Sequence, residues 1–412
     1  MFSIKLGLKN LSRQKRRNII TILVIAFAFF GYLFMESMMN GMEEMSFDNI
    51  KHFETGNIQI AYPEYWKDKD ELPLEHLIEW DSELEKDLRQ TEGVMGLSPE
   101  LRFSANLNNG IDEMRVIGVG IIPENYNQVF ETQDYFLEGS MSALEQSQAV
   151  IGEQMAELLD LTINDYVILL VRTKEDTFNT IDVEIGGIVK TLNPVMNNRM
   201  VLVPLELAQE RLNVEDGISM LSLKTSSGEE ETVIQSFEGY FRQENLPFQA
   251  YTWQESAKNV IALAVAKKSG AGAVLSVVLL IGMVGIINNI ILSALERTSE
   301  IGMMKALGMK EWEIVFVFMV EATGIGVLGG LTGCLLGLVG VNWVVKNGIS
   351  FGFLGEDMSK YGIPILDRLY GVWNGSTFYY IFFLGIFVAI LSSIIPASWA
   401  AHKDPVEAIY HR

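Results

Sequence analysis

The chain has 412 residues, of which 49% are hydrophobic, and a formal net charge of −21. This length favours two or three folded units over one, and so apolar and acidic a composition argues against a single soluble globule. The apolar residues concentrate in four long runs, and the acidic residues lie mainly between the first two runs. We therefore expect a membrane protein with a large water-exposed domain.

The amino-terminal segment is basic and precedes the first apolar run. Residues 1–18 contain no acid and six basic side chains: Lys5, Lys9, Arg13, Lys15, Arg16 and Arg17. Because basic segments stay in the cytoplasm, we expect this end there, as an interfacial elbow along the inner leaflet. The following run is too long for a signal peptide and lacks a small-residue cleavage pattern. Residues 1–39 are therefore predicted to form the elbow and a retained first span.

Four methionines follow at spacings of three and four: Met35, Met38, Met42 and Met45. These spacings place them on one face of a helix. Methionine is flexible and polarisable, which suits a surface that contacts variable apolar cargo. Ordinary packing against a neighbouring helix is the alternative, and we favour it.

Residues 40–268 are predicted to form a separate extracytoplasmic α+β domain, inserted between the first and second spans. They hold 17 Lys/Arg and 41 Asp/Glu. Alternating residues predict strands at 56–62, 165–172, 180–189 and 219–224, and Asn108-Asn-Gly110 predicts a hairpin turn. Helical patterns cover 74–90, 152–160, 204–212 and 229–243.

We expect no catalytic residue and no metal site in this domain. His52 and His76 are isolated from each other and from any cysteine, so solvated surface positions are the better interpretation. This domain also lacks a Gly-x-Ser-x-Gly nucleophile motif, and the chain has no Gly-x-x-x-x-Gly-Lys-Ser/Thr phosphate-binding loop. If ATP drives the protein, a partner chain therefore hydrolyses it.

Three further runs, 270–294, 314–345 and 376–397, are long enough to cross a hydrocarbon core, which takes about 20 apolar residues. With the first run, they predict four transmembrane helices, because backbone amides in lipid must be bonded internally. We expect a core over 269–345, an extracytoplasmic loop over 346–375, and a last span with a cytoplasmic tail over 376–412.

Between the second and third spans lies a short charged segment, 294–314. Glu296 and Glu300 are one helical turn apart, Arg297 precedes Glu300 by three residues, and Lys305 precedes Gly308, which is placed like a helix-terminating glycine. This pattern predicts a short, sharply ended helix. Such a helix makes a rigid lever.

The predicted spans contain polar and small residues. Glu321 in the third span is costly in lipid unless it is paired, and we expect it to face Asn288 or Asn289 in a structural polar clamp. The third span also carries rows of small residues that allow close helix packing: Gly326 with Gly330, and Gly329 with Gly333 and Gly337.

Several motifs occur together: Leu295-Glu-Arg-Thr-Ser-Glu-Ile-Gly302, Lys305-Ala-Leu-Gly308, Glu321-Ala, and the glycine-rich stretch 324–337. With the amino-terminal LGLKNLSRQKRRNIITILVI and the carboxyl-terminal segment 404–409, they resemble the FtsX-like permease domain of the MacB/FtsX/LolC–LolE group of ABC transporters. The resemblance covers all four spans and implies a MacB-like periplasmic core. It also implies that residues 294–310 contain a coupling helix seated on an ATPase, with contact residues Glu296, Arg297, Glu300, Gly302, Lys305 and Gly308.

By this resemblance the chain is a non-catalytic permease subunit of the inner membrane, with both termini cytoplasmic. It binds no cofactor itself; ATP and magnesium are used by a cytoplasmic ATPase dimer. Further expected partners are a second permease subunit, membrane lipids, a lipoprotein cargo and a periplasmic carrier, and no nucleic acid. The layout is closest to LolC and LolE, which release lipoproteins. However, segment 172–181 is short and lacks the proline-containing hook that docks the carrier. A MacB-like exporter of peptides or drugs, and a membrane receptor, remain as alternatives.

Overall fold

The computed structural model describes residues 2–226, 228–350 and 368–402. The chain divides into two compact units. The first, here called the helical unit, comprises the described residues 2–43, Leu263–Ser350 and 368–402. The second, called the sheet unit, comprises Glu44–Ala262. Two helices belong partly to each unit: α2 (Lys15–Ile50) and α11 (Lys258–Glu296).

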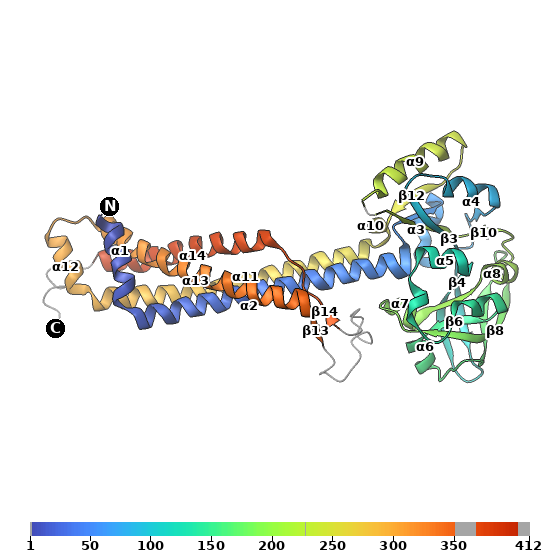
Figure 1. Cartoon of the computed structure of the whole chain (residues 1–412), viewed down its shortest axis with the longest axis horizontal. Coiled ribbons are helices and arrows are strands. Elements are labelled where there is room, and N and C mark those ends of the chain that lie inside the picture. The colour runs from blue at the N-terminus through green and yellow to red at the C-terminus, as the bar shows by residue number, and fades with distance from the viewer. Residues whose placement is uncertain (1, 227, 351–367, 403–412) are drawn as a thin grey trace. The chain divides into compact units, whose positions relative to one another are not determined.

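The helical unit contains four helices that are long and apolar enough to cross a membrane among the described residues. They are α2, α11, α13 (Glu311–Asn347) and α14 (Gly375–Ala401). This confirms the four spans predicted from the sequence. The unit also contains α1 (Phe2–Arg13), α12 (Thr298–Ala306) and a strand pair, β13 (Ile349–Ser350) with β14 (Arg368–Leu369). Figure 1 shows α1 and α12 at the same end of the bundle.

Two rows of glycines on α13 allow its neighbours to approach closely. A Cβ added at Gly333 would lie 2.7 Å from the Cβ of Phe29 on α2, and one at Gly329 would lie 2.9 Å from Ile25. On another face, a Cβ at Gly326 would lie 2.8 Å from Ala389 on α14. The row that contains Gly329 and Gly333 therefore packs against α2, and the row that contains Gly326 packs against α14, as the small-residue spacing predicts.

The sheet unit is built on a 10-stranded sheet in the order β12-β1-β11-β3-β4-β9-β6-β8-β5, with β7 paired to both β3 and β8. Its strands are β1 (Ile58–Ala61), β3 (Val94–Asn108), β4 (Glu113–Ile121), β5 (Phe136–Gly139), β6 (Ala149–Gly152), β7 (Tyr166–Arg172), β8 (Phe178–Val189), β9 (Met200–Pro204), β11 (Met220–Thr225) and β12 (Gln249–Thr252). Because β7 joins β8 back to β3, the path β3-β4-β9-β6-β8-β7 closes on itself.

Every second side chain along the strands points into this closed ring and fills it. On β7, Val167 and Leu169 are fully buried, whereas Ile168 and Leu170 are exposed. The inward side chains join Phe103, Val183 and others in the largest apolar core of the unit. Since successive strand residues point to opposite faces, one register puts every second residue into this core.

Short helices surround the strands: α3 (Pro63–Asp68), α4 (Ser82–Arg89), α5 (Pro123–Val129), α6 (Glu153–Leu158), α7 (Pro194–Arg199), α8 (Leu205–Leu212), α9 (Glu230–Gln243) and α10 (Trp253–Ser256). In Figure 1, α4 and α9 lie at one end of the sheet unit and α6 at the other. Leu88 of α4 and Phe237 of α9 are buried in the main core.

Most predicted elements of this unit are found with shifted ends. The predicted hairpin joins β3 to β4, and Gly110 has φ +90°, the left-handed conformation that glycine favours. The helix predicted over 74–90 is wrong in its first half, because β2 (Ile78–Glu79) pairs there with β10 (Gly217–Ile218). The predicted outer loop falls mostly outside the described residues, as do residues 404–409.

Candidate coupling site at helix α12

Helix α12 is separated from α11 by one non-helical residue and ends at a defined stop. Arg297, with φ −113° and ψ 23°, interrupts the helical path. At the other end Gly308 has φ +91°; its N–H donates to the Lys305 carbonyl at 3.0 Å, and the Met309 N–H donates to the Met304 carbonyl at 3.0 Å. This pair of bonds is a Schellman motif, so Gly308 terminates α12 as its spacing predicts.

Ion pairs hold the start of this segment to the basic amino-terminal residues. Arg17 Nη1 lies 3.1 Å from Glu296 Oε2, and Arg13 Nη1 lies 2.9 Å from Glu300 Oε1. Gln14 also donates to Glu296. Arg297 lies at the break between α11 and α12 and pairs with Glu321 rather than with Glu300 three residues later, and its predicted role in coupling remains a prediction.

Two other predicted contact residues, Lys305 and Gly302, are largely covered by neighbouring residues. Lys305 Nζ lies 3.3 Å from Glu311 Oε1 in the first turn of α13, and its side chain is only 11% exposed. Gly302 is buried. Neither residue therefore offers much surface to a docking protein, and their predicted roles in coupling remain predictions.

Two residues that the sequence reasoning did not single out are exposed, one on α12 and one directly after it. Met303 is 54% exposed and Leu307 is 88% exposed, and their spacing of four places them on one side of the segment. They border a cavity of about 280 Å³ between α1, α12 and α13, which Leu6 and Phe318 also line. An exposed methionine and leucine beside an apolar cavity are typical of a protein contact surface.

A buried ion pair joins the junction of α11 and α12 to α13. Arg297 Nη1 lies 3.5 Å from Glu321 Oε2, and the two side chains are 8% and 0% exposed. The Ser293 hydroxyl donates to Glu321 Oε1 at 3.3 Å. The polar clamp at Glu321 therefore exists, but the predicted partners were wrong: Glu321 faces residues one and two turns further along α11 than Asn289.

Asn289 belongs to a separate polar cluster with α2. Its Oδ1 accepts from Arg17 Nε at 2.7 Å, and its Nδ2 donates to Asn18 Oδ1 and Thr21 Oγ1, both at 3.1 Å. Asn288 is exposed. Asn289 and Ser293 on α11, and Arg297 directly after it, recur at intervals of four and form one polar stripe, which contacts α2 and then α13.

The four methionines, for which packing was favoured over cargo contact, are all half-buried: Met35, Met38, Met42 and Met45. Beside them, Glu36 Oε1 accepts from Thr377 Oγ1 at 2.8 Å and from Asn374 Nδ2 at 2.9 Å. This second clamp, between α2 and the start of α14, was not predicted. A carboxylate one residue from the methionine stripe was its only signal in the sequence.

The sequence matches two family models along most of its length. Residues 19–240 match the MacB-like periplasmic core domain, and residues 272–405 match the FtsX-like permease C-terminal family. With the first match covering more than half of the chain, the protein is a multi-pass membrane protein and belongs to the FtsX/MacB type of ABC transporter permeases.

Three relatives show the range of this family. The uncharacterized ABC transporter permease MJ1507 of Methanocaldococcus jannaschii is 20% identical, over 98% of this chain and 97% of its own length. The macrolide export ATP-binding/permease protein MacB of Psychrobacter arcticus is 22% identical, over 99% of this chain but 59% of its own length. The lipoprotein-releasing system transmembrane protein LolC of Xylella fastidiosa is 21% identical, over 77% of this chain and 78% of its own length.

Proposed function

We propose that this permease transmits movement from a separate ATPase, docked at α12, to its MacB-like periplasmic core domain, and that it lifts a membrane-anchored lipoprotein out of the bilayer. In this proposal the chain hydrolyses nothing. A pair of permease subunits works with an ATPase dimer, and ATP and magnesium are bound only by that dimer.

The observation that carries the proposal is the continuity of α11 and its attachment to α12. Helix α11 runs without a break from Lys258 to Glu296, and α12 begins two residues later. The buried pair of Arg297 with Glu321 fixes the junction to α13. Because an α-helix rises about 1.5 Å per residue and is stiff along its axis, a push on α12 is transmitted along α11 rather than absorbed in a loop.

The charges support an inner-membrane location with α12 on the cytoplasmic side. The amino-terminal residues that pair with Glu296 and Glu300 belong to a segment with six basic and no acidic side chains. Such segments stay in the cytoplasm. The residues from 403 on would then also be cytoplasmic, and the acidic sheet unit would lie on the opposite side.

A direct test is to reconstitute the chain with its ATPase in liposomes and to replace the exposed pair by Met303→Ser/Leu307→Ser. Loss of two apolar anchors should lower permease-stimulated ATP hydrolysis by at least about tenfold, since each buried side chain contributes about 1.5–3 kcal/mol. Met95→Ser, in the sheet unit, is the control because Met95 is 64% exposed. Unchanged stimulation in the double variant would refute docking at α12.

For the cargo, the LolC relative and the half-buried methionine stripe favour a lipoprotein. A specific observation favours the second candidate, export of a peptide or drug as the name of MacB indicates: β7 and β8 are joined by a tight turn, in which Thr173 N–H donates to the Thr177 carbonyl at 2.7 Å, with no extended hook.

Release assays separate these two candidates. With ATP, a triacylated test lipoprotein should leave the liposomes, whereas the same protein without acyl chains should show no dependence on the permease. ATP-dependent transport of a macrolide or a soluble peptide, without lipoprotein release, would replace the first candidate by the second.

A further inference from the structure

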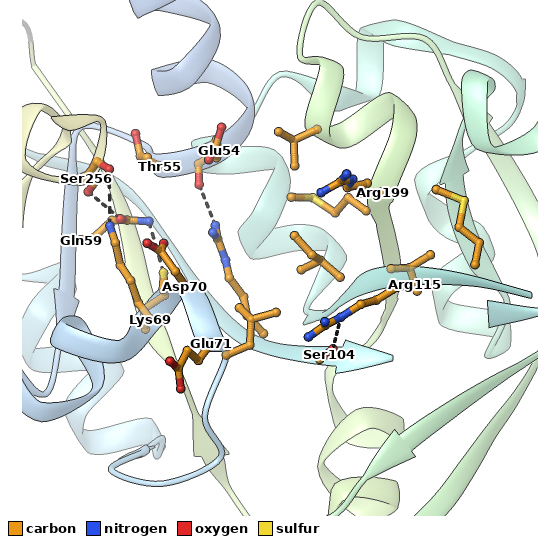
Figure 2. A pocket seen from close by; sticks show the side chains of 18 residues that line it. Glu54, Thr55, Gln59, Lys69, Asp70, Glu71, Ser104, Arg115, Arg199 and Ser256 are labelled. Atoms are coloured by element: carbon orange, nitrogen blue, oxygen red, sulfur yellow. Dashed lines mark hydrogen bonds between the residues drawn. The ribbon is translucent and has the colours of Figure 1, made fainter. Parts of the chain in front are cut away.

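The sheet unit contains a pocket of about 640 Å³ on the outward face of β3 and β4. This volume lies within the range of small-molecule sites. Its walls come from distant parts of the chain: segment 69–72, the end of α7, and the two strands. Figure 2 shows Arg115 and Arg199 on one side, and Lys69, Asp70 and Glu71 on the other.

The first wall presents two guanidinium groups. Arg115 Nε donates to Ser104 Oγ at 3.3 Å, a neutral partner that leaves its charge uncompensated. Arg199, at the end of α7, has no hydrogen-bond or ion-pair partner among the described residues and is exposed. Both guanidinium groups point toward the middle of the pocket (Figure 2). A phosphate has enough oxygens to bond two guanidinium groups, whereas a single arginine can satisfy a carboxylate by bidentate pairing.

The opposite wall presents carboxylates. Asp70 and Glu71 are exposed and have no hydrogen-bond or ion-pair partner in the described parts of the chain. The Lys69 ammonium has other contacts: its Nζ lies 3.8 Å from the centre of the Trp66 ring and 3.5 Å from the Ser256 carbonyl. Burial, and then the charge of Arg102, lower the pKa of Lys69, and the opposing effect of the Asp70 charge does not reverse this shift.

Between the walls lies Arg102, whose guanidinium group already has hydrogen-bond partners within the protein. Its guanidinium bonds Glu100 Oε2 and the Glu54 carbonyl at 2.7 Å. Burial alone would lower the pKa of Arg102, but the Glu100 carboxylate outweighs this effect and raises it. Arg102 therefore forms part of the fixed frame. Four charged residues of the pocket remain without an ion-pair partner in the described parts of the chain: Arg115, Arg199, Asp70 and Glu71.

We propose that this pocket binds a zwitterion that carries a phosphate and a primary ammonium, such as an ethanolamine phosphate group. The phosphate would lie at Arg115 and Arg199, and the ammonium at Asp70 and Glu71. The overall charge of the unit favours a zwitterion over a simple anion: residues 44–262 hold 40 acidic and 15 basic side chains, whose summed field repels a dianion but not a net-neutral ligand. This proposal does not depend on the nature of the transported cargo.

The test uses the full chain in an uncharged detergent and isothermal titration calorimetry with sn-glycero-3-phosphoethanolamine. Glycerol 3-phosphate and ethanolamine, which each carry one of the two charges, should bind at least about tenfold more weakly, the effect of losing hydrogen bonds to a charged group. Equal affinity for glycerol 3-phosphate, or no binding of the zwitterion, would overturn the proposal.

Two double variants test the two walls separately. Arg115→Gln/Arg199→Gln should weaken binding of the zwitterion by at least about tenfold. Asp70→Asn/Glu71→Gln should do the same, while binding of glycerol 3-phosphate stays equal or improves. Arg242→Gln is the matched control, because its side chain is 80% exposed and it does not line the pocket. Unchanged binding in either double variant would overturn the assignment of that wall.

A last binding experiment identifies whether the ethanolamine phosphate headgroup comes from a membrane lipid or from a soluble compound. Monomeric dihexanoylphosphatidylethanolamine carries the same headgroup on short acyl chains. Tighter binding of this lipid than of the water-soluble headgroup supports a membrane lipid as the ligand, and equal binding supports a soluble phosphodiester of ethanolamine. If neither compound bound to the wild-type protein, the proposal would be overturned.

Discussion

The helical unit and the sheet unit are stabilised by different interactions. In the sheet unit, alternating aliphatic residues such as Val167 and Leu169 fill a closed ring of strands. In the helical unit, contacts depend on glycines such as Gly333 and on buried polar groups such as Arg297 and Glu321. Because apolar side chains gain little by leaving lipid, close approach and polar pairing replace the hydrophobic effect there. The same kind of substitution should therefore have different effects in the two units.

The largest effect is expected from Glu321→Ala. It would leave the Arg297 charge buried without its partner, which costs about 3–5 kcal/mol of folding free energy. Thermal unfolding in detergent measures the loss. The double variant Arg297→Leu/Glu321→Leu should recover most of the stability, since an apolar pair carries no desolvation penalty. If Glu321→Ala left the unfolding temperature unchanged, the ion pair would not be what holds this end of α11 to α13.

In the sheet unit, Leu169→Ala should cost about 2–5 kcal/mol, because it opens a cavity in the closed ring. The neighbouring Leu170→Ala is the matched control: Leu170 is 39% exposed on the same strand, and its loss should cost well under half as much. Denaturant unfolding compares the two variants. Equal destabilisation would contradict the inward and outward assignment of β7.

A smaller effect is expected from Gly333→Ala, whose new Cβ would lie 2.7 Å from the Cβ of Phe29. Overpacking of this kind costs about 1–3 kcal/mol. Gly282→Ala on α11 is the control, because no atom lies within 4 Å of its added Cβ, and it should be neutral or slightly stabilising. Melting temperatures of both variants in detergent test the difference, and a stable Gly333→Ala would argue against the tight contact of α13 with α2.

The smallest effect on stability is expected from Arg13→Ala. Its pair with Glu300 is exposed, at 60% and 40% of the two side chains, and such pairs contribute about 0–1 kcal/mol. The melting temperature should therefore change little. A loss as large as that of Glu321→Ala would mean that α1 holds α12 far more firmly than an exposed ion pair can.

The sequence predicted the elements that follow from periodicity. Four long apolar runs are the four spanning helices, and alternation located β7 and β8. Gly308 was identified correctly because helix termination needs a positive φ that glycine adopts easily. These features depend on local sequence pattern and can therefore be predicted without knowledge of the tertiary structure.

Partners across helices were predicted less well. Asn289 and Glu321 were expected to meet, but their pairing depends on the offset between α11 and α13, which the hydrophobic pattern of either helix does not determine. The break at Arg297 likewise has no glycine or proline to signal it. The pocket lined by Asp70, Arg115 and Arg199 depends on the sheet topology, since these residues are distant in sequence.

Cysteine labelling of α12 tests the central claim, ATPase docking on the cytoplasmic side, most directly. In a background with Cys334→Ala, which removes the only native cysteine, Met303→Cys is exposed to a membrane-impermeant maleimide in sealed, oriented vesicles. The account predicts labelling from the cytoplasmic side alone, and protection when the ATPase is bound. Labelling from the opposite side, or equal labelling with and without the ATPase, would contradict it.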